Sequence, residues 1–165
     1  LCRVLEINEF SILDYGCGYG ELVNYLNKDK DSKFDYFGFD ISEEMIKQAS
    51  LAFKNLQNVS FDSKLNDQKF DYVMASGIFN VRLNLADNED WLKYVITTIH
   101  SFNDLSLKGF SFNLLTSYSD SEYMKDYLYY ADPRLLFDYC MKNFSRNVAL
   151  LHDYRLFEFT IIVKK

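Results

Sequence analysis

The stretch SILDYGCGYGEL, residues 11–22, carries the strongest local pattern of this chain. A short apolar run reaches the acid Asp14. Beyond it, glycines stand at alternate positions, Gly16, Gly18 and Gly20, and a helical pattern follows. Glycine has no Cβ and accepts positive φ, so the backbone of such a turn can approach a ligand closely. The helix N terminus that follows offers free N–H groups and a positive dipole end, so the stretch predicts a strand, a binding turn and a helix.

The spacing of these glycines bears on which ligand the turn holds. The dinucleotide fingerprint is G-x-G-x-x-G. Counted from Gly16 or from Gly18, its last position falls on Glu21 or Val23, neither of which is glycine or alanine. The pattern acid-x-G-x-G-x-G instead resembles motif I of the class I S-adenosylmethionine (SAM) dependent methyltransferases. The resemblance implies that Asp14 is oriented toward the amino group of the methionine moiety of SAM.

The same resemblance assigns the cofactor-binding turn to four residues: Gly16, Cys17, Gly18 and Gly20. A second likeness lies in the stretch FGFDISEEMI. Its acid, Asp40, directly follows an apolar run and lies about 20 residues beyond Gly20, the last glycine of the turn. A carboxylate there can accept hydrogen bonds from both ribose hydroxyls. The segment resembles motif II of the methyltransferases, which implies that Ile41 and Met45 flank the adenine. Resemblance to the same family implies that Asp62 contacts the adenine amino group, and a solvated loop acid is the alternative.

Apolar periodicity predicts alternating strands and helices over the chain. We expect strands at residues 11–15, 34–39, 59–61, 70–75, 109–115, 148–152 and 157–163, and helices at about 21–26, 43–55, 90–102 and 133–143. Residues 1–7 have the spacing of a helix end, and residues 120–130 fit either a helix or an irregular lid. The alternation predicts a doubly wound, mostly parallel, seven-stranded α/β sheet with helices on both faces. The short connection after residue 152 predicts an antiparallel C-terminal hairpin, as in the class I methyltransferase fold.

Further candidates follow the other strands, because ligands of open parallel sheets bind at the carboxyl ends of the strands. After the fourth strand, the resemblance implies that Ser76, Gly77 and Ile78 lie beside the methionine moiety and the sulfonium. Three residues are candidates for contact with a methyl acceptor: Phe79, Asn80 and Tyr130. Phe79 is also consistent with core packing, and Asn80 with a helix cap.

The candidate general base is His152, which ends a strand predicted to be parallel and has a side-chain pKa near neutrality. A histidine in a hairpin turn without a partner is the alternative. The sequence shows no ligand spacing typical of a metal site, so no metal is expected. The segment after the fourth strand lacks the Pro-Pro-aromatic element of amino-methylating DNA enzymes, since the one proline is Pro133.

Composition limits the remaining possibilities. The 165 residues are 48% hydrophobic and 25% charged, which is typical of one globular domain over residues 1–165. The net charge of −6 and the absence of a long Lys/Arg cluster disfavour nucleic-acid binding. Three scattered cysteines suit a reducing cytoplasm, and no apolar run is long enough for a membrane span. The chain begins with Leu1 and has only ten residues before the first strand, so we expect it to be trimmed at the N terminus.

The sequence thus predicts a SAM-dependent methyltransferase that transfers a methyl group to an O or N atom of a small-molecule acceptor, with S-adenosylhomocysteine (SAH) as the product. Two alternatives stay open. One is a non-catalytic subunit with this fold, and the other is a nicotinamide-dependent oxidoreductase, which shares the glycine turn and Asp40. The sequence indicates neither the acceptor nor an oligomeric state.

Overall fold

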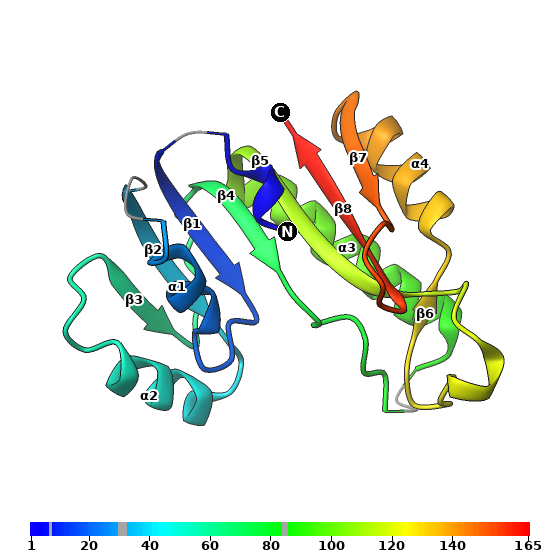
Figure 1. Cartoon of the computed structure of the whole chain (residues 1–165), viewed down its shortest axis with the longest axis horizontal. Coiled ribbons are helices and arrows are strands. Elements are labelled where there is room, and N and C mark those ends of the chain that lie inside the picture. Colours follow the sequence, from blue (N-terminus) through cyan, green and yellow to red (C-terminus); the bar gives the residue numbers. More distant parts are fainter. Residues whose placement is uncertain (7, 30–32, 84–85) are drawn as a thin grey trace.

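A computed structural model of the chain describes residues 1–6, 8–29, 33–83 and 86–165 (Figure 1). Its elements, in chain order, are η1 (Cys2–Val4), β1 (Glu9–Tyr15), α1 (Glu21–Leu26), β2 (Lys33–Phe39), α2 (Glu43–Ala52), β3 (Val59–Asp62), β4 (Phe70–Ala75), α3 (Asn88–Leu105), β5 (Ser106–Thr116), η2 (Ser121–Tyr123), β6 (Tyr130–Ala131), α4 (Pro133–Asn143), β7 (Asn147–Leu151) and β8 (Glu158–Lys164). The expected helix end at residues 1–7 is a single 3-10 turn, and residue 7 lies outside the described part.

All the strands join one sheet in the order β3-β2-β1-β4-β5-β8-β7, with β6 paired to β5 beside this path. The pairs among β1 to β5 are parallel, whereas β8 runs antiparallel to both β5 and β7. The predicted parallel sheet with an antiparallel C-terminal hairpin is therefore confirmed. The additional strand, β6, is two residues long and lies at the end of the ambiguous segment 120–130.

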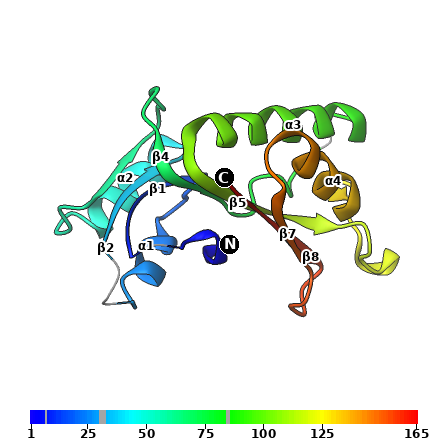
Figure 2. The same ribbon diagram turned by 90° about the horizontal axis from the view of Figure 1, so that it is seen from above.

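Two hydrophobic cores lie on opposite faces of the sheet, because successive strand residues point to opposite sides. Along β1, Ile12 joins the core beneath η1 and α1, while Leu13 joins the core beneath α3 and α4. Figure 2 shows α3 and α4 on one side of the sheet and α1 with the N terminus on the other. Helices thus cover both faces, as the alternation of strands and helices predicts.

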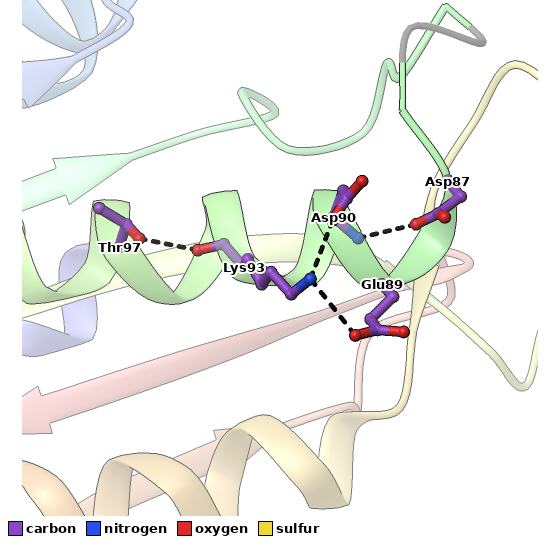
Figure 3. Close-up of polar contacts among 5 residues, drawn as sticks. All are labelled: Asp87, Glu89, Asp90, Lys93 and Thr97. Atoms are coloured by element: carbon purple, nitrogen blue, oxygen red, sulfur yellow. Dashed lines mark hydrogen bonds and ion pairs between the residues drawn. The ribbon is translucent and has the colours of Figure 1, made fainter.

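The helices α2, α3 and α4 begin where a side chain accepts a hydrogen bond from a free backbone N–H group. Ser42 caps α2, Asp87 caps α3 and Asp132 caps α4. At the start of α3, the carboxylate of Asp87 accepts from the N–H of Asp90 at 2.8 Å, and Lys93 pairs with Asp90 and Glu89 (Figure 3). These two ion pairs are solvent-exposed, so the cap contributes more to the stability of the helix than they do.

None of the described helices is long and apolar enough to cross a bilayer.

Candidate functional site

The glycine turn is tied to the neighbouring strand by its backbone. The N–H groups of Gly16 and Cys17 both donate to the carbonyl of Phe39, at 2.7 and 2.9 Å, and Phe39 is the last residue of β2. The turn after β1 and the start of the loop after β2 are therefore held side by side at the carboxyl edge of the sheet. This is the position at which open parallel sheets bind ligands.

The glycines of this edge serve two different purposes. Gly16, Gly18, Gly20 and Gly77 all have positive φ, between 53° and 80°. A Cβ at Gly16 would lie 2.3 Å from Cγ2 of Ile78, and one at Gly20 would meet the rings of Phe53 and Phe61. A Cβ at Gly18 or Gly77 would meet no atom within 4 Å. Packing and backbone geometry both demand glycine at Gly16 and Gly20, whereas Gly18 and Gly77 border open space that a ligand can fill.

Asp14 is a buried carboxyl group at the head of the turn, with 6% of its surface exposed. Its Oδ2 accepts a hydrogen bond from the hydroxyl of Tyr36 at 2.7 Å. Burial raises the pKa of Asp14 to about 6; the Tyr36 hydrogen bond lowers this pKa and the charge of Asp40 raises it. A carboxylate so placed gains from a cationic partner, because an opposite charge offsets the cost of its burial.

Asp40 holds the turn from the opposite side. One carboxylate oxygen accepts from the N–H of Gly18 at 3.0 Å, and the other accepts from the N–H of Ser42 at 2.9 Å. Asp40 therefore fixes the shape of the glycine turn and the entry into α2. An ionised carboxylate offers about four lone-pair sites, so these two bonds leave room for ribose hydroxyls.

Two cavities meet across Gly16 and Ser76, which line both of them. The larger, of about 740 Å³, lies on the η1 side between Asp14, Met74 and the residues Leu1 and Cys2. The smaller, of about 340 Å³, is bordered by Asp40 and Gly77. Together they form one groove that crosses the glycine turn, with a carboxyl group in each part.

The other predicted cofactor residues lie along this edge to different degrees. Ile41 lines the smaller cavity and leaves 87% of its surface exposed, while Met45 is half-buried in the first turn of α2. Asp62 is exposed at the end of β3 and accepts from the N–H of Lys64 at 2.9 Å. Burial raises the pKa of the Cys17 thiol to about 12, so this thiol stays protonated in the turn.

The segment after β4 connects the groove to β5. The N–H of Gly77 donates to Oδ1 of Asn113 at 2.8 Å, and Ile78 lines the smaller cavity. Asn80 accepts from the N–H of Leu115 through its side chain at 3.1 Å and from the N–H of Tyr129 through its carbonyl. Asn80 thus anchors this segment to β5 and to the chain before β6.

Three of the predicted acceptor-side residues line neither cavity of the groove. Phe79 is fully buried against Phe102 and Phe112, so it belongs to the core beneath α3 and is not available to an acceptor. Tyr130 lies in β6 paired with Leu115 of β5, its hydroxyl accepts from the N–H of Lys125, and its contact with an acceptor stays a prediction. The third residue, His152, is described next.

His152 follows β7, which has the predicted direction. However, β8 inserts between β5 and β7, so β7 becomes the edge strand and lies three strand positions from β4. The exposed ring of His152 contacts Tyr118 and Phe159, and Phe159 belongs to the core on the α3 and α4 side. His152 therefore lies at the predicted carboxyl edge of the sheet but on its outer strand, away from the glycine turn, and its role as general base stays a prediction.

Sequence reasoning also missed three residues at this edge. Tyr36, inside β2, reaches Asp14, and Asn113 of β5 links Gly77 to Glu158 of β8. The only local signal for the contact between Tyr36 and Asp14 is the alternation of side chains along β2, which places Tyr36 on the same face of the sheet as Asp14. Asn113 and Glu158 are far apart in the chain, so only the order of the strands brings them together. Among the described residues, no group of three or more His, Cys, Asp or Glu side chains has the arrangement of a metal site.

Comparison with known proteins defines the class of this chain. The sequence model of the family described as "Methyltransferase domain" matches residues 8–103, more than half of the chain. The chain therefore belongs to the methyltransferase domain family, and it is a class I SAM-dependent methyltransferase. The nicotinamide-dependent alternative does not agree with this family.

A relative and two solved structures illustrate the likeness. "Putative methyltransferase Rv1506c" of Mycobacterium tuberculosis is 52% identical over 157 residues, which cover 94% of this chain and 93% of that protein. A SAM-dependent methyltransferase from Aquifex aeolicus has a TM-score of 0.58 at 14% identity, over 94% of this chain and 81% of that one. The methyltransferase domain of bacterial CtHen1-CN has a TM-score of 0.65 at 15% identity, over 94% and 90% of the two chains. At these low identities, the two structures establish the fold.

The groove fits the cofactor of this class. Open space at Gly18 and Gly77 admits a ligand against bare backbone, and the exposed Ile41 offers an apolar surface beside a carboxylate. The buried Asp14 provides the negative charge that an ammonium group needs. SAM carries an amino group, ribose hydroxyls and an adenine ring, and this groove has a suitable contact for each.

Proposed function

We propose that this methyltransferase acts on an O or N atom of a small-molecule acceptor, and that the groove across Gly16 holds its cofactor. The single observation that carries the proposal is the pairing of the buried Asp14 and the half-buried Asp40 on either side of a glycine turn with open space. SAM supplies an electrophilic methyl group when it is bound. The residues of this chain position it and exclude water from it, which is most of what such a transfer requires.

Each predicted cofactor residue takes a role consistent with its contacts. Asp14 binds the amino group and Asp40 binds the ribose hydroxyls, while Gly16, Cys17, Gly18 and Gly20 form the turn. Ile41, Met45 and Asp62 border the adenine. Ser76, Gly77 and Ile78 lie along the methionine moiety, where both cavities meet. Asn80 supports this last segment through β5 and does not contact the acceptor.

A small acceptor is favoured because the net charge of −6 disfavours nucleic acid. The three cysteines are all free thiols, two of them buried, which is consistent with a reducing cytoplasm. We propose that the chain forms one domain of this kind over residues 1–165.

The test is a calorimetric titration of the purified chain with SAH and, separately, with NAD⁺. We expect saturable binding of SAH only, and binding weakened at least about tenfold in Asp40→Ala, since each tenfold is about 1.4 kcal/mol. Because Asp40 also shapes the turn, Ser42→Ala is the matched control. It removes the neighbouring cap on the N–H of Met45 and leaves the carboxylate in place. Binding of NAD⁺ alone, or equal SAH affinity in the wild type and Asp40→Ala, would contradict the proposal.

A further inference from the structure

A polar site lies on the η1 side of the sheet, next to the groove but outside its two cavities. In the register of the sheet, Met74 of β4 pairs with Ser111 of β5, and Ser111 pairs with Ile162 of β8. Two residues further along β5, Asn113 pairs with Thr160, and Leu115 pairs with Glu158. Because side chains alternate along a strand, Asn113, Leu115, Thr160 and Glu158 share the face on which Met74 lines the larger cavity.

Hydrogen bonds link this face directly to the segment that lines the groove. Oδ1 of Asn113 accepts from the N–H of Gly77 at 2.8 Å, and Nδ2 of Asn113 donates to Oε2 of Glu158. The amide orientation is determined by this pair of partners, since only the oxygen accepts and only the nitrogen donates. Asn113 therefore links Glu158 to Gly77, which borders the smaller cavity of the groove.

Over the residues that the structure describes, most of the other carboxylates that bind a side chain have a positively charged partner, whereas Glu158 does not. Asp71 pairs with Lys108, Asp132 with Arg134, and Glu6 with Lys164. Glu158 is half-buried and forms no ion pair within the described part of the chain, and its bond is to a neutral amide. A partly buried carboxylate without a counter-charge favours a cationic ligand.

The surroundings of Glu158 suggest the rest of that ligand. The hydroxyls of Tyr154 and Thr160 are hydrogen-bonded to each other at 2.8 Å beside it. Leu115 pairs with Glu158 in the register, and Leu151 pairs with Thr160, so half-buried apolar side chains flank the polar groups. An amine carried on an apolar body matches this arrangement.

We propose that Glu158 is the acceptor-binding carboxylate of this enzyme and that the acceptor is an amine on an apolar body. This inference rests on the proposed function. Glu158 pairs with the protonated amine and holds it next to the groove. Before methylation the amine releases one proton to solvent water (R–NH₃⁺ + H₂O → R–NH₂ + H₃O⁺), which frees the nitrogen lone pair. A hydroxyl gains less from this site because it carries no charge, and a carboxylate acceptor is repelled.

The test uses three probes with one ring and different end groups: 2-phenylethylamine, 2-phenylethanol and phenylacetate. Each is titrated calorimetrically into wild-type protein saturated with SAH, into Glu158→Gln and into Glu9→Gln. Glu9 is an exposed carboxylate at the start of β1, at the opposite edge of the sheet, so its variant makes the same change in net charge away from the site. The amine should bind the wild type and Glu9→Gln about five- to tenfold more tightly than the alcohol, and phenylacetate should bind most weakly.

In Glu158→Gln, the preference for the amine should disappear while the affinity for SAH and the melting temperature stay those of the wild type. With radiolabelled SAM, transfer to the amine should fall in the same variant. The inference is overturned if the wild type shows no preference for the amine, which includes the absence of binding by all three probes, or if Glu158→Gln keeps the preference. A wild type that fails to bind SAH contradicts the proposed function instead, so the two failures are distinguishable.

Discussion

The first half of the sheet, β1 to β4, and the second half, β5 to β8, build their parts of the site in different ways. In the first half, the groove is made of short segments that directly follow strands, around Asp14, Asp40 and Gly77. In the second half, Asn113 of β5 and Glu158 of β8 are hydrogen-bonded although they are 45 residues apart in the chain. The match to the methyltransferase domain family covers residues 8–103 and ends inside α3, between the two halves.

This difference teaches that the first half depends mainly on its backbone and the second half on side chains. The glycine turn presents bare backbone to a ligand, and Gly16 and Cys17 are held by backbone hydrogen bonds to Phe39, which do not depend on the identity of that side chain. The second half presents side chains on an open strand face, where a single substitution changes the chemistry offered to an acceptor. Such a division suits a fold that keeps one cofactor and accepts different substrates.

The largest expected effect tests the backbone half at Gly16. In Gly16→Ala, the new Cβ would lie 2.3 Å from Cγ2 of Ile78 at a φ of 80°, so both packing and backbone oppose it. We expect SAH affinity to fall about 100-fold, equivalent to about 2.7 kcal/mol, together with a lower melting temperature. Calorimetry and thermal unfolding measure the two effects.

Gly18→Ala is the control for this prediction, because its Cβ would meet no atom within 4 Å. Its strain is limited to about 1–2 kcal/mol from the positive φ, while the added methyl group projects into the groove. SAH affinity should therefore fall more than the stability does. If Gly18→Ala binds SAH like the wild type, the cofactor does not approach the backbone here, and the contrast between the halves fails.

A smaller effect concerns the buried charge of the first half. Because burial raises the pKa of Asp14 to about 6, above its unfolded value of about 3.9, the native state holds this proton more tightly. The stability from this carboxyl group is fully present below pH 4 and is lost as the pH rises through 6. Asp14→Asn has no carboxyl group to titrate and does not undergo this loss. Relative to the wild type, its free energy of unfolding should therefore increase by on the order of 1 to 3 kcal/mol as the pH rises from 4 to 7.5.

Thermal unfolding at a series of pH values from 4 to 8 measures this difference. Tyr36→Phe sharpens the test, because it removes the hydrogen bond that lowers the pKa of Asp14. The loss of stability should then extend to higher pH than in the wild type. Parallel pH profiles for the wild type and Asp14→Asn would show that Asp14 titrates normally and that its burial has no energetic consequence.

The smallest effect lies in α3, which joins the two halves. In Asp87→Ala, the loss of the N-cap should lower the free energy of unfolding by about 1 kcal/mol. Lys93→Ala removes only exposed ion pairs and should cause no measurable change. Denaturant unfolding measures both, and SAH affinity should stay unchanged in each. A larger effect for Lys93→Ala than for Asp87→Ala would reverse the ranking of caps over surface pairs in this helix.

The sequence by itself determined most of the elements and the edge of the sheet at which the groove lies. Alternating apolar residues, the glycine turn and the acids after β1 and β2 are local signals, and the sheet and its direction follow from their order. Local patterns also placed β4 at residues 70–75 and α4 at residues 133–143, as the structure has them. These features depend on residues a few positions apart, so no long-range contact is needed to predict them.

The tertiary structure alone decided which side chains meet on the acceptor side. His152 has the predicted strand direction, but the insertion of β8 moves it to the outer edge of the sheet. Phe79 follows β4 as predicted, yet its side chain turns into the core beneath α3. Asn113 and Glu158 become neighbours because β5 and β8 pair, and Tyr36 reaches Asp14 because β1 and β2 pair. Strand order and the choice of face are properties of the whole sheet, which is why no local pattern could specify them.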